Sequence, residues 1–177
     1  MASKLRVDSI LPVDGAPTSG GGGIVQCVST TKTTQQSVLD SSGSSAYPSG
    51  AVDIMTVTIT PTRSDSKILV SSTVQAASSD AAILYMFRDS TLINAGTEGS
   101  SGASGAYRGW AHVRMYRTNE TYSYTTQFLD EPATTSAITY KVKGLNMEGS
   151  TTLYINRRAS NDTYSLTSFL TLMEFSA

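Results

Sequence analysis

The sequence predicts an all-β protein, folded as an antiparallel β-sandwich that follows an extended N-terminal arm. From residue 24 onwards, about nine or ten short segments alternate apolar and polar side chains, as half-buried strands do. Glycine, serine, proline and asparagine separate these segments, and no stretch keeps a helical period for more than a turn or two. A jelly roll is the most economical way to close so many short strands in one domain.

Length and charge limit the classes of function. The 177 residues are enough for one domain that buries about two thirds of its unfolded surface without metal ions or disulfides. A formal charge of -1, from 13 Lys and Arg against 14 Asp and Glu, argues against nucleic-acid binding and against a general membrane-surface role. Cys27 is the only cysteine and His112 the only histidine, so neither a disulfide nor a zinc site is expected.

The first 23 residues differ from the rest of the chain. Prolines, an Asp-Gly pair and the glycines at 20–23 forbid regular structure, so residues 1–23 are predicted to be an arm with a flexible linker, and residues 24–177 the folded domain. Apolar side chains on such an arm need another surface, which favours a docking peptide over a frayed terminus. These predicted docking residues are Leu5, Val7, Ile10, Leu11 and Val13.

The N-terminal sequence also bears on where the protein is made. It lacks the apolar core of a secretory signal, and no run approaches the ~18 apolar residues of a membrane span. We therefore expect synthesis in the cytoplasm and no membrane insertion.

The first strands of the predicted domain lie between residues 24 and 74. Residues 24–29 form the first, in which Cys27 is expected as a small buried residue. Residues 30–50, rich in serine, threonine and glycine, are predicted to be a long loop. Residues 54–60 and 67–74 both alternate, and we expect them to form a hairpin or to lie as neighbours.

A tight turn is predicted in the middle of the chain. Residues 83–88 and 91–93 flank Asp89 and Ser90, and both residue types favour turns. A second loop rich in glycine and serine follows at residues 94–106.

The longest alternating stretch, residues 107–132, is predicted to be one hairpin that turns at Asn119 and Glu120. One face would then be largely apolar and join the core, with the opposed pairs Met115 and Tyr124, Val113 and Thr126, Ala111 and Phe128. The other face would carry an aromatic and basic strip consisting of Arg108, Trp110, His112, Arg114 and Tyr116.

The C-terminal part contains three further predicted strands. Residues 137–143 alternate, residues 153–155 are short, and residues 157–162 form a charged loop. Residues 166–175 are apolar on both faces, with Leu166, Leu170 and Leu172 on one and Phe169, Met173 and Phe175 on the other. A strand of this kind needs cover on both sides, which favours contact with another subunit.

Catalytic motifs are weak in this sequence. Asp130 and Glu131 are adjacent and lie on opposite faces of a strand, so they cannot form the facing pair that glycoside hydrolysis requires. His112 has no Gly-x-Ser-x-Gly turn to accompany it, and the glycines at 20–23 lack the Lys-Ser/Thr of a phosphate-binding loop. No catalytic, cofactor-binding or metal-binding residue is therefore predicted.

The strip from Arg108 to Tyr116 is left as the candidate surface. Trp, Tyr and Arg are enriched at the centres of protein interfaces, which favours contact with another subunit or another protein. A solvated sheet face with arginines extended along it is a second interpretation. Contact with a ligand such as a sugar ring is the third.

Several short motifs follow one another along nearly the whole chain, at residues 4–10, 13–15, 59–61, 65–70, 88–91, 129–132, 139–142 and 170–175. No single motif is specific, but their order along the chain resembles that of tail-fibre-like and other surface structural proteins of marine tailed bacteriophages.

The resemblance implies a C1q/TNF-like (tumour-necrosis-factor-like) jelly roll that assembles as a homotrimer, with the N-terminal arm joining it to a capsid or tail protein. The resemblance implies no catalytic residues for this chain. Similar modules occur at fibre tips and as capsid decoration. No extended repeat or coiled-coil shaft is present in this chain, which favours a short fibre, spike or cement-type protein. We thus expect a virion-surface protein without enzymatic activity, and the alternative is a tip module that binds a host surface glycan.

Overall fold

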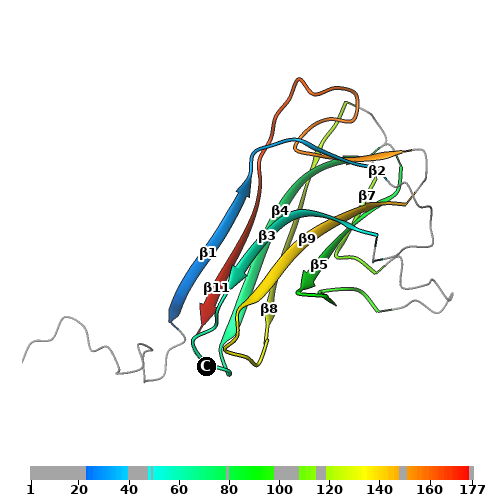
Figure 1. Cartoon of the computed structure of the whole chain (residues 1–177). Helices are drawn as coiled ribbons and strands as arrows, with labels where there is room; N and C mark the ends of the chain where they lie inside the picture. The colour runs from blue at the N-terminus through cyan, green and yellow to red at the C-terminus, as the bar shows by residue number, and fades with distance from the viewer. Residues whose placement is uncertain are drawn as a thin grey trace, which may run out of the picture.

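The computed structural model describes residues 23–39, 48, 50–78, 80–97, 108–114, 119–147 and 151–175. The predicted docking residues of the arm and Tyr116 lie outside these ranges. The described residues form eleven strands in two antiparallel sheets and contain no helix, which confirms the predicted all-β sandwich (Figure 1).

Sheet A is built around β4, which is its longest strand and lies at its centre. β8 pairs with one side of β4, and β11 and β10 pair with successive parts of the other side. β1 then pairs with β11, and β2 with β10. The strands of sheet A are β1 (Ile24–Lys32), β2 (Gln36–Leu39), β4 (Lys67–Ser78), β8 (Tyr122–Asp130), β10 (Thr152–Ile155) and β11 (Ser168–Phe175).

Sheet B has β9 and β5 at its centre. β3 pairs with the outer side of β9, while β6 and β7 pair with successive parts of the outer side of β5. The strands of sheet B are β3 (Val52–Ile59), β5 (Ala82–Arg88), β6 (Thr91–Ile93), β7 (Ala111–Val113) and β9 (Ile138–Asn146).

Both ends of the sandwich can be defined from the strand register. At one end, called the base, β1 begins and β11 ends, because Ile24 and Phe175 are register partners. The loop of residues 156–167, between β10 and β11, lies at the opposite, distal end (Figure 1). The eight residues of β11 separate the loop from the base by about 25 Å, at ~3.3 Å per residue.

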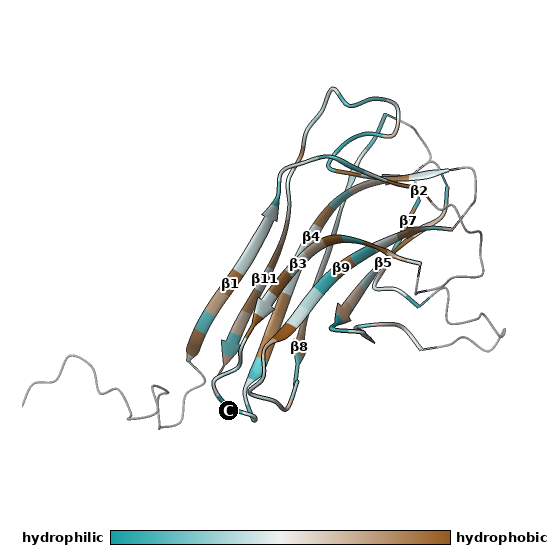
Figure 2. Cartoon of the chain, viewed as in Figure 1, coloured by the Kyte–Doolittle hydropathy of each residue, from teal (hydrophilic) through white to brown (hydrophobic). Residues whose placement is uncertain are grey.

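The main core lies between the two sheets and follows from the alternation along the strands. Inward side chains of β4 and β11, such as Val70 and Leu172, meet inward side chains of β5 and β9, such as Leu84 and Val142. In Figure 2 the colour along β9 changes repeatedly between hydrophobic and hydrophilic, as expected where successive residues face opposite sides. This alternation leaves each sheet with an outer face.

Gly144 shows how closely the sheets approach each other. A Cβ at this position would lie 2.6 Å from Cδ2 of Leu153 in sheet A and 2.8 Å from Cδ1 of Ile54 in sheet B. Any larger residue would therefore push apart two core side chains.

A second apolar cluster covers the outer face of sheet B. Ile83, Tyr85 and Phe87 point outward from β5 and pack with Leu145 and Met147. The rings of Tyr85 and Phe87 meet edge to face, with centroids 6.4 Å apart. As a result, β5 is buried on both faces.

Most predicted strands are confirmed, with ends that differ by a few residues, and so is the turn at Asp89 and Ser90, where β5 and β6 pair directly. Asp89 has a positive φ of 53°, which aspartate tolerates better than most residues. β2 was missed, because its four residues lie in the polar stretch predicted to be a loop.

Two predicted pairings are wrong. β3 and β4 do not pair, because β3 belongs to sheet B and β4 to sheet A. The hairpin at residues 107–132 is also absent: β7 pairs with β5, and β8 pairs with β4, in different sheets. Both β7 and β8 keep the predicted apolar face, including Val113 and Phe128, toward the core, so the alternation identified the faces but not the partners.

Candidate functional site

An apolar row crosses the outer face of sheet A near the base. The strand register aligns one outward residue from each of four adjacent strands. This set, called the apolar row, consists of Cys27 on β1, Met173 on β11, Leu69 on β4 and Leu129 on β8. Such a row on a solvent-facing sheet is typical of a surface that another protein covers.

The row lies in a wider apolar area at the base. Leu129 is 50% exposed, and Ile24, next to Phe175, is also exposed. At the edge, Nζ of Lys67 lies 2.8 Å from Oε1 of Glu131, so charged groups border the apolar side chains. An apolar centre with a polar rim is the usual anatomy of a protein interface.

The outer face of sheet A becomes polar toward the distal end. One step beyond the apolar row, the four strands contribute Ser29, Thr171, Ser71 and Gln127. A further step along, Phe169 is 41% exposed between threonines of β1 and β4. The apolar area is thus confined to the base, apart from Phe169.

Cys27 corrects an expectation from the sequence. It was expected to be buried, but it is exposed on the outer face. The neighbouring Val28 packs against the core instead. Alternation in β1 shows that Cys27 and Val28 face opposite ways, but not which of them faces inward.

A buried carboxylate, Glu174, closes the base from the inside. Its Oε1 accepts hydrogen bonds from N and Oγ1 of Thr62 at 2.7 Å and from Oγ of Ser66 at 2.6 Å, and its Oε2 accepts one from Nε2 of Gln26 at 2.5 Å. Burial raises the pKa of Glu174, but these hydrogen bonds outweigh burial and keep the pKa below its usual value. Glu174 therefore ties β1, β11 and the β3–β4 loop together.

Asp130 bridges the two sheets at the same end. Its carboxylate accepts two hydrogen bonds from Nη1 of Arg88, at 2.9 and 2.8 Å, and one from the hydroxyl of Tyr140 at 2.6 Å. Burial, followed by the contact with Asp130, raises the pKa of Tyr140 far above its usual value. Asp130 comes from sheet A and its partners from sheet B, so this cluster holds the sandwich closed.

Asn156 organises the distal loop. This residue is fully buried with a φ of 61°, and its Nδ2 donates hydrogen bonds to the carbonyls of Lys32 and Thr34 at 2.8 and 3.1 Å. Its Oδ1 accepts a hydrogen bond of 2.6 Å from Oγ of Ser168, which in turn accepts one from the backbone N–H of Gln75. The loop therefore leaves the sheet from a fixed point.

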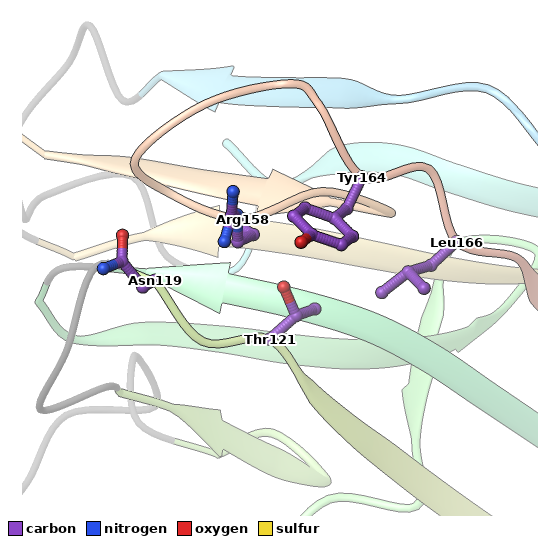
Figure 3. A pocket seen from close by; sticks show the side chains of 5 residues that line it. All are labelled: Asn119, Thr121, Arg158, Tyr164 and Leu166. Atoms are coloured by element: carbon purple, nitrogen blue, oxygen red, sulfur yellow. The ribbon is translucent and has the colours of Figure 1, made fainter.

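The distal loop forms one wall of a pocket of about 330 Å³ (Figure 3). Residues 119–121, which precede β8, form the opposite wall. The guanidinium carbon of Arg158 lies 4.0 Å from the ring centroid of Tyr164, within the range of a cation–π contact. The residues that line the pocket are Asn119, Thr121, Arg158, Tyr164 and Leu166.

Two described residues of the predicted aromatic and basic strip, Trp110 and His112, face opposite sides of sheet B. Trp110 lies just before β7, donates its backbone N–H to the carbonyl of Leu84 and packs against the main core. His112 is exposed on the outer face of sheet B, opposite Ile83. The backbone before β7 can pass this close to β5 because residue 109 is a glycine: a Cβ there would lie 2.1 Å from Cγ2 of Ile83.

The two arginines of the strip each contact another segment of the chain. Nε of Arg108 donates a hydrogen bond of 2.9 Å to the carbonyl of Gly96. Arg114 is exposed, with Nη2 3.8 Å from Oδ1 of Asp80. Tyr116 is outside the described residues, and the role of the strip in binding stays a prediction.

The described residues contain neither a metal-binding cluster nor a membrane-spanning helix. No group of three His, Cys, Asp or Glu side chains is placed to hold a metal ion in this part of the chain. It also has no helix with the length and apolar character needed to cross a membrane.

Sequence reasoning missed both Glu174 and the distal pocket. Glu174 has a signal in the sequence, because it shares the parity of Leu170 and Leu172 and so had to face the core with them. The pocket has none, since Thr121 and Arg158 belong to distant segments that only the fold brings together.

Comparison with known proteins does not assign the chain to a family. Neither the protein-family models nor the curated proteins give a match.

Proposed function

We propose that the chain is a non-enzymatic structural protein of a tailed-bacteriophage virion. It is a jelly-roll module that assembles as a homotrimer through the outer face of sheet A. The N-terminal arm attaches it to a capsid or tail protein, and it is displayed on the particle surface as a short tail fibre, a spike or a capsid-decorating protein. The sequence resemblance to phage surface proteins supports the virion location.

The strand order supports the jelly-roll assignment. β1 and β2 lie end to end along one side of β11 and β10, and β6 and β7 lie end to end along β5. If each such set is counted as one interrupted strand, both sheets have about four strands, and the chain passes between the sheets as in a double Greek key.

The apolar row is the observation that carries the proposal of assembly. Leu129, Met173 and Leu69 lie side by side on a solvent-facing sheet, and transfer of such side chains from water favours association. Identical copies related by a symmetry axis would bury this area against one another. The resemblance to trimeric jelly rolls favours three copies over two.

The position of the base supports attachment by the arm. The chain enters β1 at Ile24, beside the end of β11, so the arm is connected to the base of the sandwich. The distal loop lies at the other end (Figure 1). A protein attached to a particle at its base would present this loop to the surroundings.

Sedimentation of a matched pair of variants tests the assembly. Leu129 and Thr125 both point outward from β8, but only Leu129 lies in the apolar row. We expect the unmodified protein to sediment at three times the chain mass of 18.7 kDa. Leu129→Glu should weaken association by at least about 100-fold, because a carboxylate would be buried without a partner. Thr125→Glu should leave the trimer intact.

A stable monomer at micromolar concentration would contradict the assembly proposal. If Leu129→Glu and Thr125→Glu weaken association equally, the interface is not centred on the apolar row.

Removal of residues 2–20 tests attachment to the virion. The truncated protein should fold and assemble normally but fail to join particles, because the docking residues Leu5 to Val13 are lost. Incorporation of the truncated protein at normal levels would refute the docking role of the arm.

A second candidate function is a receptor-binding tip that recognises a host surface glycan. The observation that favours it is the distal pocket, which lies away from the base and contains an arginine, a tyrosine, a threonine and an asparagine. Both functions are compatible in one protein.

A further inference from the structure

One wall of the distal pocket, the distal loop, is held in place by hydrogen bonds within the chain. Nε2 of Gln35 donates hydrogen bonds to the carbonyls of Asp162 and Tyr164, at 2.9 and 3.2 Å, and to Oγ of Ser165 at 2.9 Å. Together with the hydrogen bonds of Asn156, these bonds hold the distal loop both at its start and near its end. A loop held in this way loses little conformational entropy when a ligand binds against it.

Arg158 gives the pocket a positive charge that no carboxylate pairs with in the described part of the chain. Its Nε and Nη2 donate to Oδ1 of Asn161, at 3.3 and 3.1 Å, and this neutral acceptor orients the guanidinium without neutralising it. Glu120 is the acidic residue next to Asn119 on the opposite wall, and its carboxylate accepts a hydrogen bond from the hydroxyl of Tyr122. A fixed, unpaired guanidinium is a preorganised site for a carboxylate.

Thr121 contributes a polar atom that lacks a partner. Its Oγ1 is buried and makes no hydrogen bond to any described residue. In Figure 3 this hydroxyl points toward the side chains of Arg158 and Tyr164. Buried hydroxyls in proteins are nearly always hydrogen-bonded, so this one indicates a partner that enters the pocket.

The remaining walls are suited to a sugar ring. Leu166 is apolar, Tyr164 is 54% exposed, and Asn119 adds an amide at the rim. The volume of about 330 Å³ lies at the lower end of the range of small-molecule sites, ~300–1,000 Å³. Rings that pair an apolar face with hydroxyl groups match walls of this mixed character.

We propose that the distal pocket binds a carboxylate-bearing sugar, such as a uronic acid unit of a surface polysaccharide. The guanidinium of Arg158 binds the carboxylate, Thr121 and Asn119 bind hydroxyl groups, and Leu166 and Tyr164 contact the ring carbons. This inference rests on the second candidate function and names its ligand class. It does not depend on the oligomeric state, because all five lining residues belong to one chain.

The test compares two ligands that differ at one carbon. Methyl glucuronide carries a carboxylate where methyl glucoside carries a hydroxymethyl group. Titration of the full-length protein, followed by NMR, should give a Kd for the glucuronide in the millimolar range, as expected for a ligand of this size. The glucoside should bind at least about fivefold more weakly, and added salt should reduce the difference.

Two arginine variants provide a matched control. Arg158→Gln should weaken glucuronide binding at least about tenfold, because the charged partner of the carboxylate is lost. Arg157→Gln should change it less than about twofold, since Arg157 lies over the ring of Tyr154, 4.8 Å from its centroid, and does not line the pocket. Similar losses in both variants would indicate a general effect of charge and would overturn the proposal.

Thr121→Val keeps the shape of the side chain and removes the unpaired hydroxyl. We expect weaker binding of both sugars by about threefold or more, with no loss of thermal stability, because no intramolecular hydrogen bond is broken. This variant keeps the proposal testable if Arg158→Gln fails to fold.

Three outcomes would refute the inference: no glucuronide binding at 50 mM, equal affinity for the two sugars, or equal affinity for acetate alone. None of them bears on trimer formation or on incorporation into particles, which are measured separately.

Discussion

The outer faces of the two sheets contain similar side chains but differ in their environment. On sheet B, Phe87 is only 8% exposed, packed in the cluster with Tyr85 and Leu145. On sheet A, Phe169 and Leu129 are 41% and 50% exposed. One chain thus covers one of its outer apolar faces and leaves the other open.

The difference shows where the single chain buries its outer apolar side chains and where it leaves them exposed. Side chains on the outer face of sheet B stabilise the single chain, because they are removed from water within it. Side chains of the apolar row gain this stabilisation only on association. Substitutions on the two faces should therefore affect different equilibria.

The largest expected effect comes from two phenylalanines. In a Leu129→Glu background, which we expect to keep the chain monomeric, Phe87→Ala should lower the free energy of unfolding by about 3–5 kcal/mol. Phe169→Ala should lower it by less than about 1 kcal/mol, because its ring already contacts water. Urea unfolding measures both values. Similar losses would remove the distinction between the two faces.

Glu174→Gln tests the inner support of the apolar row, because Glu174 ties β1 to β11. At neutral pH the variant should be about 2 kcal/mol less stable, since charge-assisted hydrogen bonds from Ser66, Gln26 and Thr62 are weakened. Glu131→Gln is the control, because its exposed carboxylate pairs with Lys67 at the surface. It should change stability by less than about 0.5 kcal/mol.

The pH dependence of Glu174 has a defined sign. Its pKa in the folded protein is lower than the unfolded value of 4.5, so its contribution is fully present above pH 4.5. That contribution is lost as the pH falls below 4.5 and through the folded pKa. Unfolding curves of the unmodified protein and of Glu174→Gln should therefore converge in acid, and a constant difference down to pH 2 would contradict this assignment.

The smallest effect concerns the accessibility of a single thiol. Cys27 is the only cysteine of the chain, so a thiol reagent reports on the apolar row alone. In the assembled protein its labelling should be at least about tenfold slower than in Leu129→Glu, because a neighbouring subunit covers it. Equal rates, with assembly verified by sedimentation, would place the interface elsewhere.

Most strands of this fold were predictable from local pattern. The alternation in residues 67–74 and 137–143 corresponds to β4 and β9, and the two-sided apolar stretch at 166–175 corresponds to β11. Outward apolar residues on β11 were also predicted, and two of them, Phe169 and Met173, lie on the outer face of sheet A. These predictions hold because each depends on residues within one strand.

Strand partners and the distal pocket were not predictable in the same way. β7 and β8 are close in sequence and both alternate, yet they pair with β5 and β4 in different sheets. Hydrophobic alternation predicts that a strand has an apolar face, but it does not predict which other strand will pair with it.

By itself, the sequence determined that the chain folds as strands, where most of them begin and end, and which of their side chains share a face. The reason is that side-chain alternation is a property of the extended backbone. Only the tertiary structure decided that Cys27 faces outward, that Trp110 faces inward and that Thr121 meets Arg158. Those outcomes depend on which distant strands pack together, and burial against a partner is a property of the whole assembly of strands.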